Sequence, residues 1–309
     1  MIMRKLLLFI GISLFSLIIY AQDCNYDENA RRFVVRGDVA IKEATKDEDF
    51  ISAAEEFKKA LQYAPNCPDI YESIGACYEK SIGKGGSIDI KSYSEAIKAY
   101  KKYLELKPNL PNKEMVLNTI YELEYKCEKL CVQKIGKGMV INGVCWAIHN
   151  VDEPGTFATT PESTGKFYQW NRRTGWNATE YHSGWDNSLP SGESWTIAND
   201  PSPAGWRIPT KDEIDRLSDE TEVKNEWFIQ NGVQGIKFTD KSTGNSIFLP
   251  AAGIINDGKF REEQRNGYYW TNTLKDTSGA YSLRFGYTFK LYVEGLYCKY
   301  GANVRCVAE

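Results

Sequence analysis

The sequence predicts two folded regions of different class. An all-α helical-repeat region comes first, and an α+β domain with a mainly antiparallel sheet follows it. Three observations lead to this prediction. Residues 53–66 and 96–109 repeat one amphipathic pattern, and all eight tryptophans lie at or after Trp146. Of the 25 glycines, 19 follow Lys134. A chain of 309 residues is also long enough for about two domains.

The first segment, residues 1–21, has the features of a secretory signal peptide. Arg4 and Lys5 precede an apolar core of about 14 residues, and the small Ala21 marks the cleavage position. This core is shorter than the roughly 20 residues that span a bilayer, which disfavours an uncleaved anchor. Asp23, directly before Cys24, departs from the small residue of a lipoprotein signal. We therefore expect an exported protein, periplasmic, on the outer surface or secreted, with no membrane span after cleavage.

The helical region, residues 25–134, contains a repeat with an offset of 43 residues. Apolar side chains recur in it at i, i+4 and i+8, which places them in one stripe of a helix. The two stripes consist of Ala53, Phe57 and Leu61, and of Ala96, Tyr100 and Leu104. Pro65 and Pro108 end these helices, because proline cannot continue the hydrogen-bond ladder. Further helices are expected over 30–43 and 68–80, with Gly37 and Gly75 as small contact positions, and over 112–134.

This pattern resembles tetratricopeptide repeats, whose period is about 34 residues. The Gly-rich insert at residues 81–90 accounts for the excess of about nine residues. The resemblance implies stacked helix pairs, with the helix at 112–134 covering the exposed face of the second repeat. The concave groove of such a stack either binds a protein partner or serves as a spacer.

The second region, residues 138–309, contains short segments rich in aromatic and β-branched residues, separated by Gly, Asn and Asp turns. Strands are expected over 138–150, 236–239, 246–250, 267–272, 280–285, 291–298 and 303–308. One helix lies among them, because Thr210 and Glu213 have the spacing of a capping box. Its apolar side is expected at Ile214, Leu217 and Val223.

Seven segments of this region occur in a specific order, at 141–151, 152–158, 167–171, 199–210, 248–253, 267–272 and 303–307. They include Ala-Gly-Trp-Arg-Ile-Pro-Thr at 204–210 and Gly-Tyr-Tyr-Trp-Thr-Asn at 267–272. Together they resemble the bacterial major-paralogous-domain family abbreviated FISUMP, which is similar in pattern to C-type-lectin-like folds. The resemblance implies a secreted or surface domain in which a compact sheet platform bears long loops. We expect the tryptophans of these motifs in the core, namely Trp146, Trp170, Trp206 and Trp270.

The chain has eight cysteines, and an exported chain meets an oxidising environment that favours disulfides. Cys298 and Cys306 flank a predicted hairpin, and Cys145 lies on a strand expected to pair near the C-terminus. Either place suits a bridge, and we rank the pair Cys298 and Cys306 slightly ahead. Members of the family often have cysteine where this chain has His149 and Ser202, so the resemblance implies that one disulfide has been lost.

The chain has no signature of a hydrolase. His149 lies in a predicted strand, and His182 lies in a polar loop where we expect it to be exposed; neither has a nucleophile motif beside it. Formylglycine-generating enzymes are similar to lectin-like folds and use paired cysteines. In this chain Cys298 and Cys306 would be the candidates for that pair. A structural bridge suits the oxidising compartment better. We therefore expect no catalysis, with an enzyme of formylglycine-generating-like or hydrolase type as the alternative.

No cofactor is expected. Calcium is the metal for which the sequence has partial motifs. Calcium-dependent lectins use Glu-Pro-Asn and Trp-Asn-Asp motifs, whereas this chain has Glu-Pro-Gly at 153–155 and Trp-Thr-Asn at 270–272. These segments supply too few of the six to eight oxygen ligands that calcium takes. The net charge of −3 leaves no basic surplus with which to neutralise phosphates, which argues against a nucleic-acid partner.

The candidate binding site is the loop of residues 171–206. It carries Trp176, Tyr181, Trp185 and Trp195, separated by Asn, Ser, Gly and Thr. Flat rings beside amides and hydroxyls suit a sugar face or a protein hot spot. We expect an exported, non-catalytic binding protein of the bacterial envelope or cell surface that recognises a glycan or protein partner through these aromatics. The alternative is a scaffold that holds its partner in the helical groove. The two are separated by the exposure of Trp185 compared with that of Tyr71, Tyr78 and Tyr100.

Overall fold

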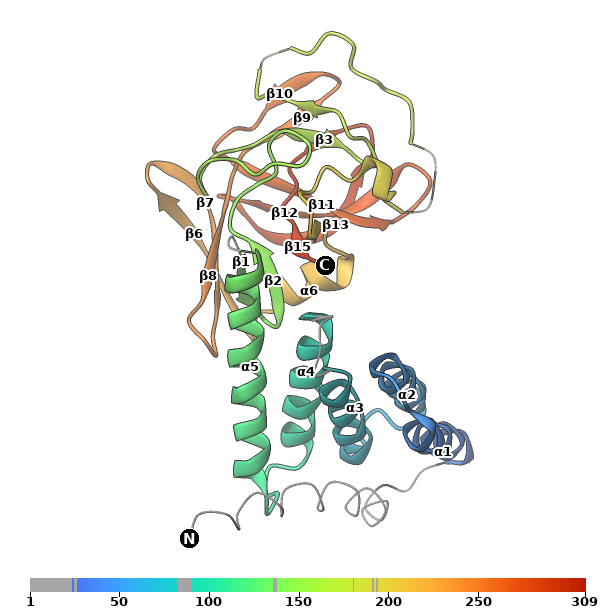
Figure 1. The fold of residues 1–309 in the computed structure, drawn as a ribbon. Helices are drawn as coiled ribbons and strands as arrows, with labels where there is room; N and C mark the ends of the chain where they lie inside the picture. Colours follow the sequence, from blue (N-terminus) through green and yellow to red (C-terminus); the bar gives the residue numbers. More distant parts are fainter. Residues whose placement is uncertain are drawn as a thin grey trace. The chain divides into compact units, whose positions relative to one another are not determined.

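The computed structural model describes Cys24 and residues 27–82, 90–135, 138–179, 181–190, 192 and 194–309. The predicted signal peptide lies outside the described residues, and so does most of the insert at 81–90. The chain divides into two compact units, one ending at Lys126 and the other running from Cys127 to Glu309. The first is helical and the second is mostly antiparallel β-structure (Figure 1). No helix among the described residues is long and apolar enough to cross a bilayer.

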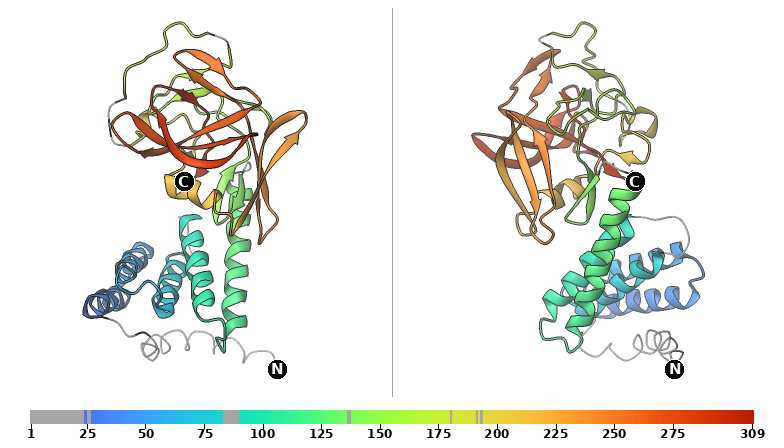
Figure 2. Two further views of the ribbon diagram at one scale, coloured as in Figure 1. Left: turned by 180° about the vertical axis from the view of Figure 1, so that it is seen from behind. Right: turned by 60° about the vertical axis from the view of Figure 1, so that its left-hand side comes forward.

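Helices follow one another along the N-terminal part, as the sequence predicts. They are α1 (Glu28–Glu43), α2 (Asp47–Ala60), α3 (Pro68–Ser81), α4 (Ile90–Leu106) and α5 (Lys113–Ile135). From α1 to α4, each helix packs against the next (Figures 1 and 2). Helix α5 supplies its first turns to the helical unit and its last turns to the β-rich unit.

The two repeats use the same helix contact, in which a glycine lies against an aromatic ring. A Cβ atom on Gly37 would lie 2.7 Å from the Phe57 ring, and one on Gly75 would lie 2.8 Å from the Tyr100 ring. Phe57 and Tyr100 are equivalent positions of the 43-residue repeat. Both rings are buried, so each glycine is needed to let the two helices approach. The small contact positions expected from the sequence are confirmed.

The described part of the second unit forms four sheets, with strand orders β1-β2-β15-β5, β10-β9-β14-β3-β4, β11-β12-β13 and β6-β7-β8. The strands are β1 (Gly138–Ile141), β2 (Val144–Ala147), β3 (Phe167–Gln169), β4 (Gly175–Trp176), β5 (Trp206–Arg207), β6 (Val223–Gln230), β7 (Val233–Asp240), β8 (Ser246–Pro250), β9 (Ile254–Asn256), β10 (Lys259–Arg261), β11 (Asn266–Leu274), β12 (Gly279–Gly286), β13 (Phe289–Tyr297), β14 (Gly301–Ala302) and β15 (Val307–Ala308). Neighbouring strands within each sheet are antiparallel. The mainly antiparallel class predicted from the sequence is confirmed.

The strand predicted over 138–150 is instead the hairpin β1–β2. The chain reverses at Asn142 and Gly143, whose φ angles are 45° and 72°. Asn-Gly is the preferred pair for a two-residue turn with both φ angles positive. Strand β2 then pairs with β15, with Val307 opposite Trp146. The expected pairing of the Cys145 strand with the C-terminal segment is therefore confirmed.

Helix α6 (Lys211–Leu217) begins at the predicted capping box. The Glu213 amide donates to the Thr210 hydroxyl at 3.2 Å, and the Thr210 amide donates to the Glu213 carboxylate at 2.8 Å. Ile214 and Leu217 are buried on its apolar side. The assignment of Val223 to this helix is wrong, because the helix ends at Leu217 and Val223 begins β6, which pairs with β7 along its whole length.

The core of the β-rich unit lies where its sheets meet α6. The four tryptophans expected in the core are buried. Their exposed fractions are 0% for Trp146, Trp170 and Trp270, and 5% for Trp206. Trp146 in β2 and Trp206 in β5 belong to one sheet, whereas Trp270 in β11 belongs to another.

Two disulfides are present, Cys24–Cys67 and Cys131–Cys145. The prediction that Cys298 pairs with Cys306 is wrong, since both are buried free thiols. They do not flank one hairpin: Cys298 follows β13, whereas Cys306 precedes β15 in another sheet.

The fold brings residues from distant segments next to Cys145 and Cys306. Cys131, at the end of α5, bonds Cys145. Gly138 makes room for this bridge, because a Cβ there would lie 2.6 and 2.7 Å from its two sulfurs. The Cys306 sulfur lies 3.1 Å from the hydroxyl of Ser202, one of the two positions at which the family often has cysteine. A serine thus stands beside Cys306 where a second thiol would lie.

Candidate functional site

The loop of residues 171–206 does not present its four aromatic side chains alike. Tyr181 is 69% exposed, and Trp176 and Trp185 are half-buried. Trp195 is only 8% exposed. The loop is attached to the sheet at Tyr181, which forms a β-bridge with Lys259 in β10.

Trp195 holds the loop in place and is not available to a ligand in this structure. Its ring meets that of Trp170 edge to face, with 5.7 Å between the ring centroids. Its indole N–H donates to the backbone oxygen of Asn199 at 3.0 Å. A long loop needs a small core of its own, and Trp195 supplies part of it. We therefore remove Trp195 from the candidate ligand-contacting residues.

Trp176, His182 and Trp185 form one cluster of rings. The centroid of the Trp176 ring lies 5.2 Å from that of His182 and 5.3 Å from that of Trp185. Both tryptophans pack against the buried cluster that contains Phe167 and Ile255. His182 is only 8% exposed, so the expectation that it is solvent-exposed is wrong. It is buried because the loop folds back onto the sheet, where its amide donates to the oxygen of Gly258 at 2.9 Å.

Two polar ring atoms inside this cluster have no hydrogen-bond partner among the described residues. They are Nε2 of His182 and Nε1 of Trp185. The other ring nitrogen of His182 lies 3.5 Å from the Thr179 hydroxyl. An indole N–H donates, and Nε2 of a neutral imidazole can accept. A hydroxyl group can both accept from one and donate to the other, so the cluster suits a hydroxyl-bearing ligand or a water molecule.

Protonation of His182 should make the β-rich unit less stable at acidic pH. Burial lowers the pKa of His182 below its usual 6.5. Between the two pKa values the unfolded chain binds a proton that the folded chain does not, so the free energy of unfolding falls as the pH falls below the unfolded value. This group contributes at most about 1.4 kcal/mol per pH unit. Fluorescence-monitored denaturation between about pH 7.5 and 5 measures the slope.

The matched variants for this prediction are His182→Gln and His149→Gln. His182→Gln should lose this part of the slope, whereas His149→Gln should keep it. Equal slopes for the wild type and His182→Gln would contradict the assignment.

Cysteine chemistry at the predicted enzyme position is disfavoured by burial. Burial raises the pKa of the Cys298 thiol to about 12 and also raises that of Cys306. The thiolate is the nucleophilic form, so these two thiols are poor nucleophiles at neutral pH. They are also unpaired with each other.

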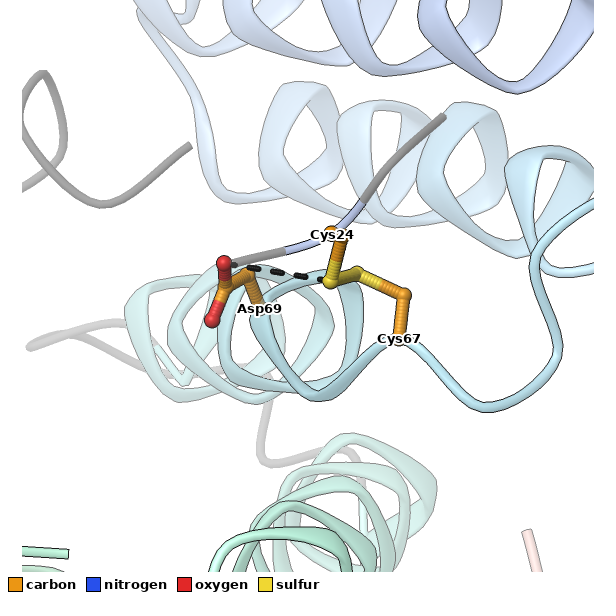
Figure 3. Close-up of side chains that lie close together, drawn as sticks. All are labelled: Cys24, Cys67 and Asp69. Atoms are coloured by element: carbon orange, nitrogen blue, oxygen red, sulfur yellow. Dashed lines mark hydrogen bonds between the residues drawn. A yellow bond between two sulfur atoms is a disulfide. The ribbon is translucent and has the colours of Figure 1, made fainter. Parts of the chain in front are cut away.

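Among the described residues, one group of side chains has the donor types of a metal site. It consists of Cys24, Cys67 and Asp69, whose ligand atoms lie within 4.8 Å of one another (Figure 3). The two sulfurs are joined in a disulfide, so they offer no thiolate, and Asp69 is paired with Lys107 at 3.1 Å. The bridge instead ties Cys24 to the N-terminus of α3. A sulfur bonded in this way is not free to carry a lipid.

A cleft that the sequence did not predict lies between the β6–β7 and β12–β13 hairpins. Its volume is about 360 Å³, and Trp227 and Tyr287 lie on its walls. Of the eight tryptophans, Trp227 is the one that neither the motifs nor the loop cluster includes. An aromatic residue in a strand is the one sequence feature that could have indicated this cleft. Core residues share that feature, so it does not single out a binding site.

The second unit is thus a β-rich domain that presents long loops on a platform of antiparallel sheets. Its sequence matches the Fibrobacter succinogenes major domain over residues 139–308. This match covers more than half of the chain, so the protein belongs to that family, and the resemblance to FISUMP is confirmed. No curated protein and no solved structure matches the chain.

Proposed function

We propose that this chain is an exported, non-catalytic binding protein that recognises a glycan through the loop of residues 171–206. The observation that carries the proposal is the ring cluster of Trp176, His182 and Trp185, with two unpartnered ring nitrogens, together with the exposed ring of Tyr181, which precedes His182 in the chain. Sugars combine an apolar face with hydroxyl groups, and such a cluster offers a partner to each. Binding loops on a rigid sheet are a common functional arrangement.

The finer fold assignments belong to the same proposal. The β-rich unit is C-type-lectin-like, which its antiparallel sheets and long loop support. The helical unit is tetratricopeptide-like, which the equivalent contacts of Gly37 with Phe57 and Gly75 with Tyr100 support. Export is supported by the two disulfides, because such bonds persist in oxidising compartments.

The helical groove is the weaker candidate for the binding site. Two of the three tyrosines proposed to line it are buried between helices, with exposed fractions of 2% for Tyr78 and 8% for Tyr100. Tyr78 accepts a hydrogen bond from Lys58 and donates one to Glu55, each at 2.8 Å. Such rings hold the helices together, whereas Trp185 is half-exposed on its loop.

The test is a glycan array probed with residues 22–309, with calcium and with chelator. We expect Tyr181→Ala to weaken the binding of a glycan held by this loop at least about fivefold, because it removes an exposed stacking ring. Tyr181 contributes little to packing, so this variant should fold normally. Ile197→Ala is the matched control, since Ile197 is 94% exposed on the same loop.

The outcomes of the array separate the alternatives. A hit that is lost in chelator would instead indicate a calcium-dependent lectin. If Tyr181→Ala binds the glycan as the wild type does, the loop is not the binding site. If a protein partner is instead captured through the helical unit, the scaffold function replaces glycan binding as the proposal.

A further inference from the structure

A second concave site lies between two hairpins of the β-rich unit. The strands β6 and β7 form one wall, and the turn between β12 and β13 forms the other. The cleft has a volume of about 360 Å³, within the range of small-ligand sites. It is lined by Asn225, Glu226, Trp227, Ile236, Phe285, Gly286, Tyr287, Thr288 and Leu291.

Two aromatic rings pack against each other at the cleft. The centroids of the Trp227 and Tyr287 rings are 5.8 Å apart and the ring planes make an angle of 68°, which is an edge-to-face contact. Tyr287 is 73% exposed, and Trp227 is half-buried. The outer part of the Tyr287 ring is therefore accessible to a ligand in the cleft.

The turn that carries Tyr287 is held by the neighbouring chain. The Tyr287 amide donates to the backbone oxygen of Arg265 at 3.2 Å, and Gly286 pairs with Phe289 across the turn. On the opposite wall, Trp227 pairs with Ile236 in the register of β6 and β7. Each ring is thus mounted on a hydrogen-bonded hairpin, so the cleft is formed before any ligand arrives.

One part of the cleft lining is apolar and another part is polar. Its floor contains Phe285, which is fully buried, with Ile236 and Leu291. Asn225, on the same face of β6 as Trp227, and Thr288 bring an amide and a hydroxyl to the lining. A ligand that suits both parts must have an apolar face and hydrogen-bonding groups around its edge, which is the chemistry of a pyranose ring.

We propose that this cleft is a sugar-binding site that takes a neutral pyranose residue of a glycan on the rings of Trp227 and Tyr287. Glu226 is the one charged side chain among the lining residues. Lys224 donates a hydrogen bond to its carboxylate at 2.8 Å, which favours the ionised form. The residues that line the cleft include no Lys, Arg or His with which an acidic sugar could pair, so the ligand class is neutral sugars.

This site is independent of the loop site. It shares no residue with the cluster of Trp176, Tyr181 and Trp185, and its elements are different strands. The two sites can therefore fail separately, and variants in one leave the other intact.

The experiment uses the full mature chain and neutral gluco-, manno-, xylo- and chito-oligosaccharides, with uronic-acid oligosaccharides for comparison. Binding is measured by titration calorimetry and by the change in tryptophan fluorescence. We expect the wild type to bind at least one neutral oligosaccharide more tightly than its acidic counterpart. Tyr287→Ala should weaken this binding at least about fivefold, because it removes one wall of the cleft. Trp227→Phe should remove most of the fluorescence change while retaining part of the affinity.

The controls separate this site from the loop. Tyr297→Ala removes a tyrosine that is 55% exposed on the same strand pair but does not line the cleft, and it should bind as the wild type does. Tyr181→Ala should leave binding at the cleft unchanged. The proposal is overturned if no neutral oligosaccharide binds, or if Tyr287→Ala and Trp227→Phe both bind with wild-type affinity. A cleft that instead captures an extended peptide, with Tyr287→Ala abolishing that capture, also overturns it.

Discussion

Replacing Asn150 with leucine is expected to lower the free energy of unfolding of the β-rich unit by about 3–5 kcal/mol. Asn150 is fully buried and accepts a hydrogen bond from Arg305 Nε at 2.9 Å. It also donates to the backbone oxygen of Thr164 at 2.9 Å and to the Tyr269 hydroxyl at 3.3 Å. Leucine has a similar volume but makes none of these bonds. Three buried polar groups would then each lose a partner.

The size of this effect follows from the charge of Arg305. Its guanidinium is buried, and burial lowers its pKa to about 10. Its Nε donates to the Asn150 side chain, and its Nη1 donates to the backbone oxygen of Ala147 at 3.1 Å. Removing a neutral acceptor from a desolvated cation costs more than removing an ordinary hydrogen bond.

The measurement is denaturation followed by tryptophan fluorescence. All eight tryptophans lie at or after Trp146, so the signal reports only the β-rich unit. Asn187→Leu, in an exposed part of the loop, is the matched control and should change the free energy by less than about 0.5 kcal/mol. Asn150→Asp should lose less than Asn150→Leu does, because it places a negative charge beside Arg305. Equal losses for the two variants would show that the charge of Arg305 plays no part.

The parts of the fold that could be predicted from the sequence are those set by interactions between residues close together in the chain. Thr210 and Glu213 cap α6 by bonds within four residues, and the stripes of Phe57 and Tyr100 repeat with helical spacing. Such patterns act within one element, so they survive in any fold that contains the element. The Asn142-Gly143 turn is equally local, and a prediction that weighed it would have divided the strand at 138–150 into a hairpin.

The parts that were missed depend on contacts between distant segments. Strand β6 exists because β7 pairs with it, so nothing in the local sequence marked its first residue, Val223, as the start of a strand rather than part of the preceding helix. The partner of Cys145 is set by the place where α5 ends, since Cys131 is brought to it by the packing of that helix. Spacing along the chain carries no information about either contact.

The candidate site shows the same limit. Trp185 and Trp195 occupy similar sequence surroundings, rich in Ser, Gly and Asp or Glu, yet one ring is half-exposed and the other is packed on Trp170. The cleft at Trp227 joins residues about 60 positions apart, so composition alone could not reveal it. Aromatic clustering drew attention to this loop, but it could not indicate which of its rings are exposed.

Replacing Trp270 is expected to lower the free energy of unfolding of the β-rich unit as much as replacing Asn150 does, for a different reason. Trp270→Ala should lower the free energy of unfolding by about 3–5 kcal/mol, because it leaves a large cavity in a core where Trp270 has no exposed surface. Trp270→Phe should cost less, about 1–3 kcal/mol, because most of the volume is kept while the buried backbone oxygen of Tyr168 loses the indole donor at 2.6 Å. Fluorescence-monitored denaturation again measures both. A Trp270→Phe protein as unstable as Trp270→Ala would contradict the cavity argument.

The two buried tryptophans are coupled through the strands that they join. Trp270, on β11, donates to Tyr168 on β3, while Trp170, just after β3, donates to the oxygen of Thr271 at 2.9 Å. Each indole therefore fixes the strand that carries the other. Once Trp270→Phe has loosened this contact, Trp170→Phe should cost less than it does in the wild type, so the double variant should lose less than the sum of the single losses, by about 0.5 kcal/mol or more. Simple additivity would mean that the two bonds act independently.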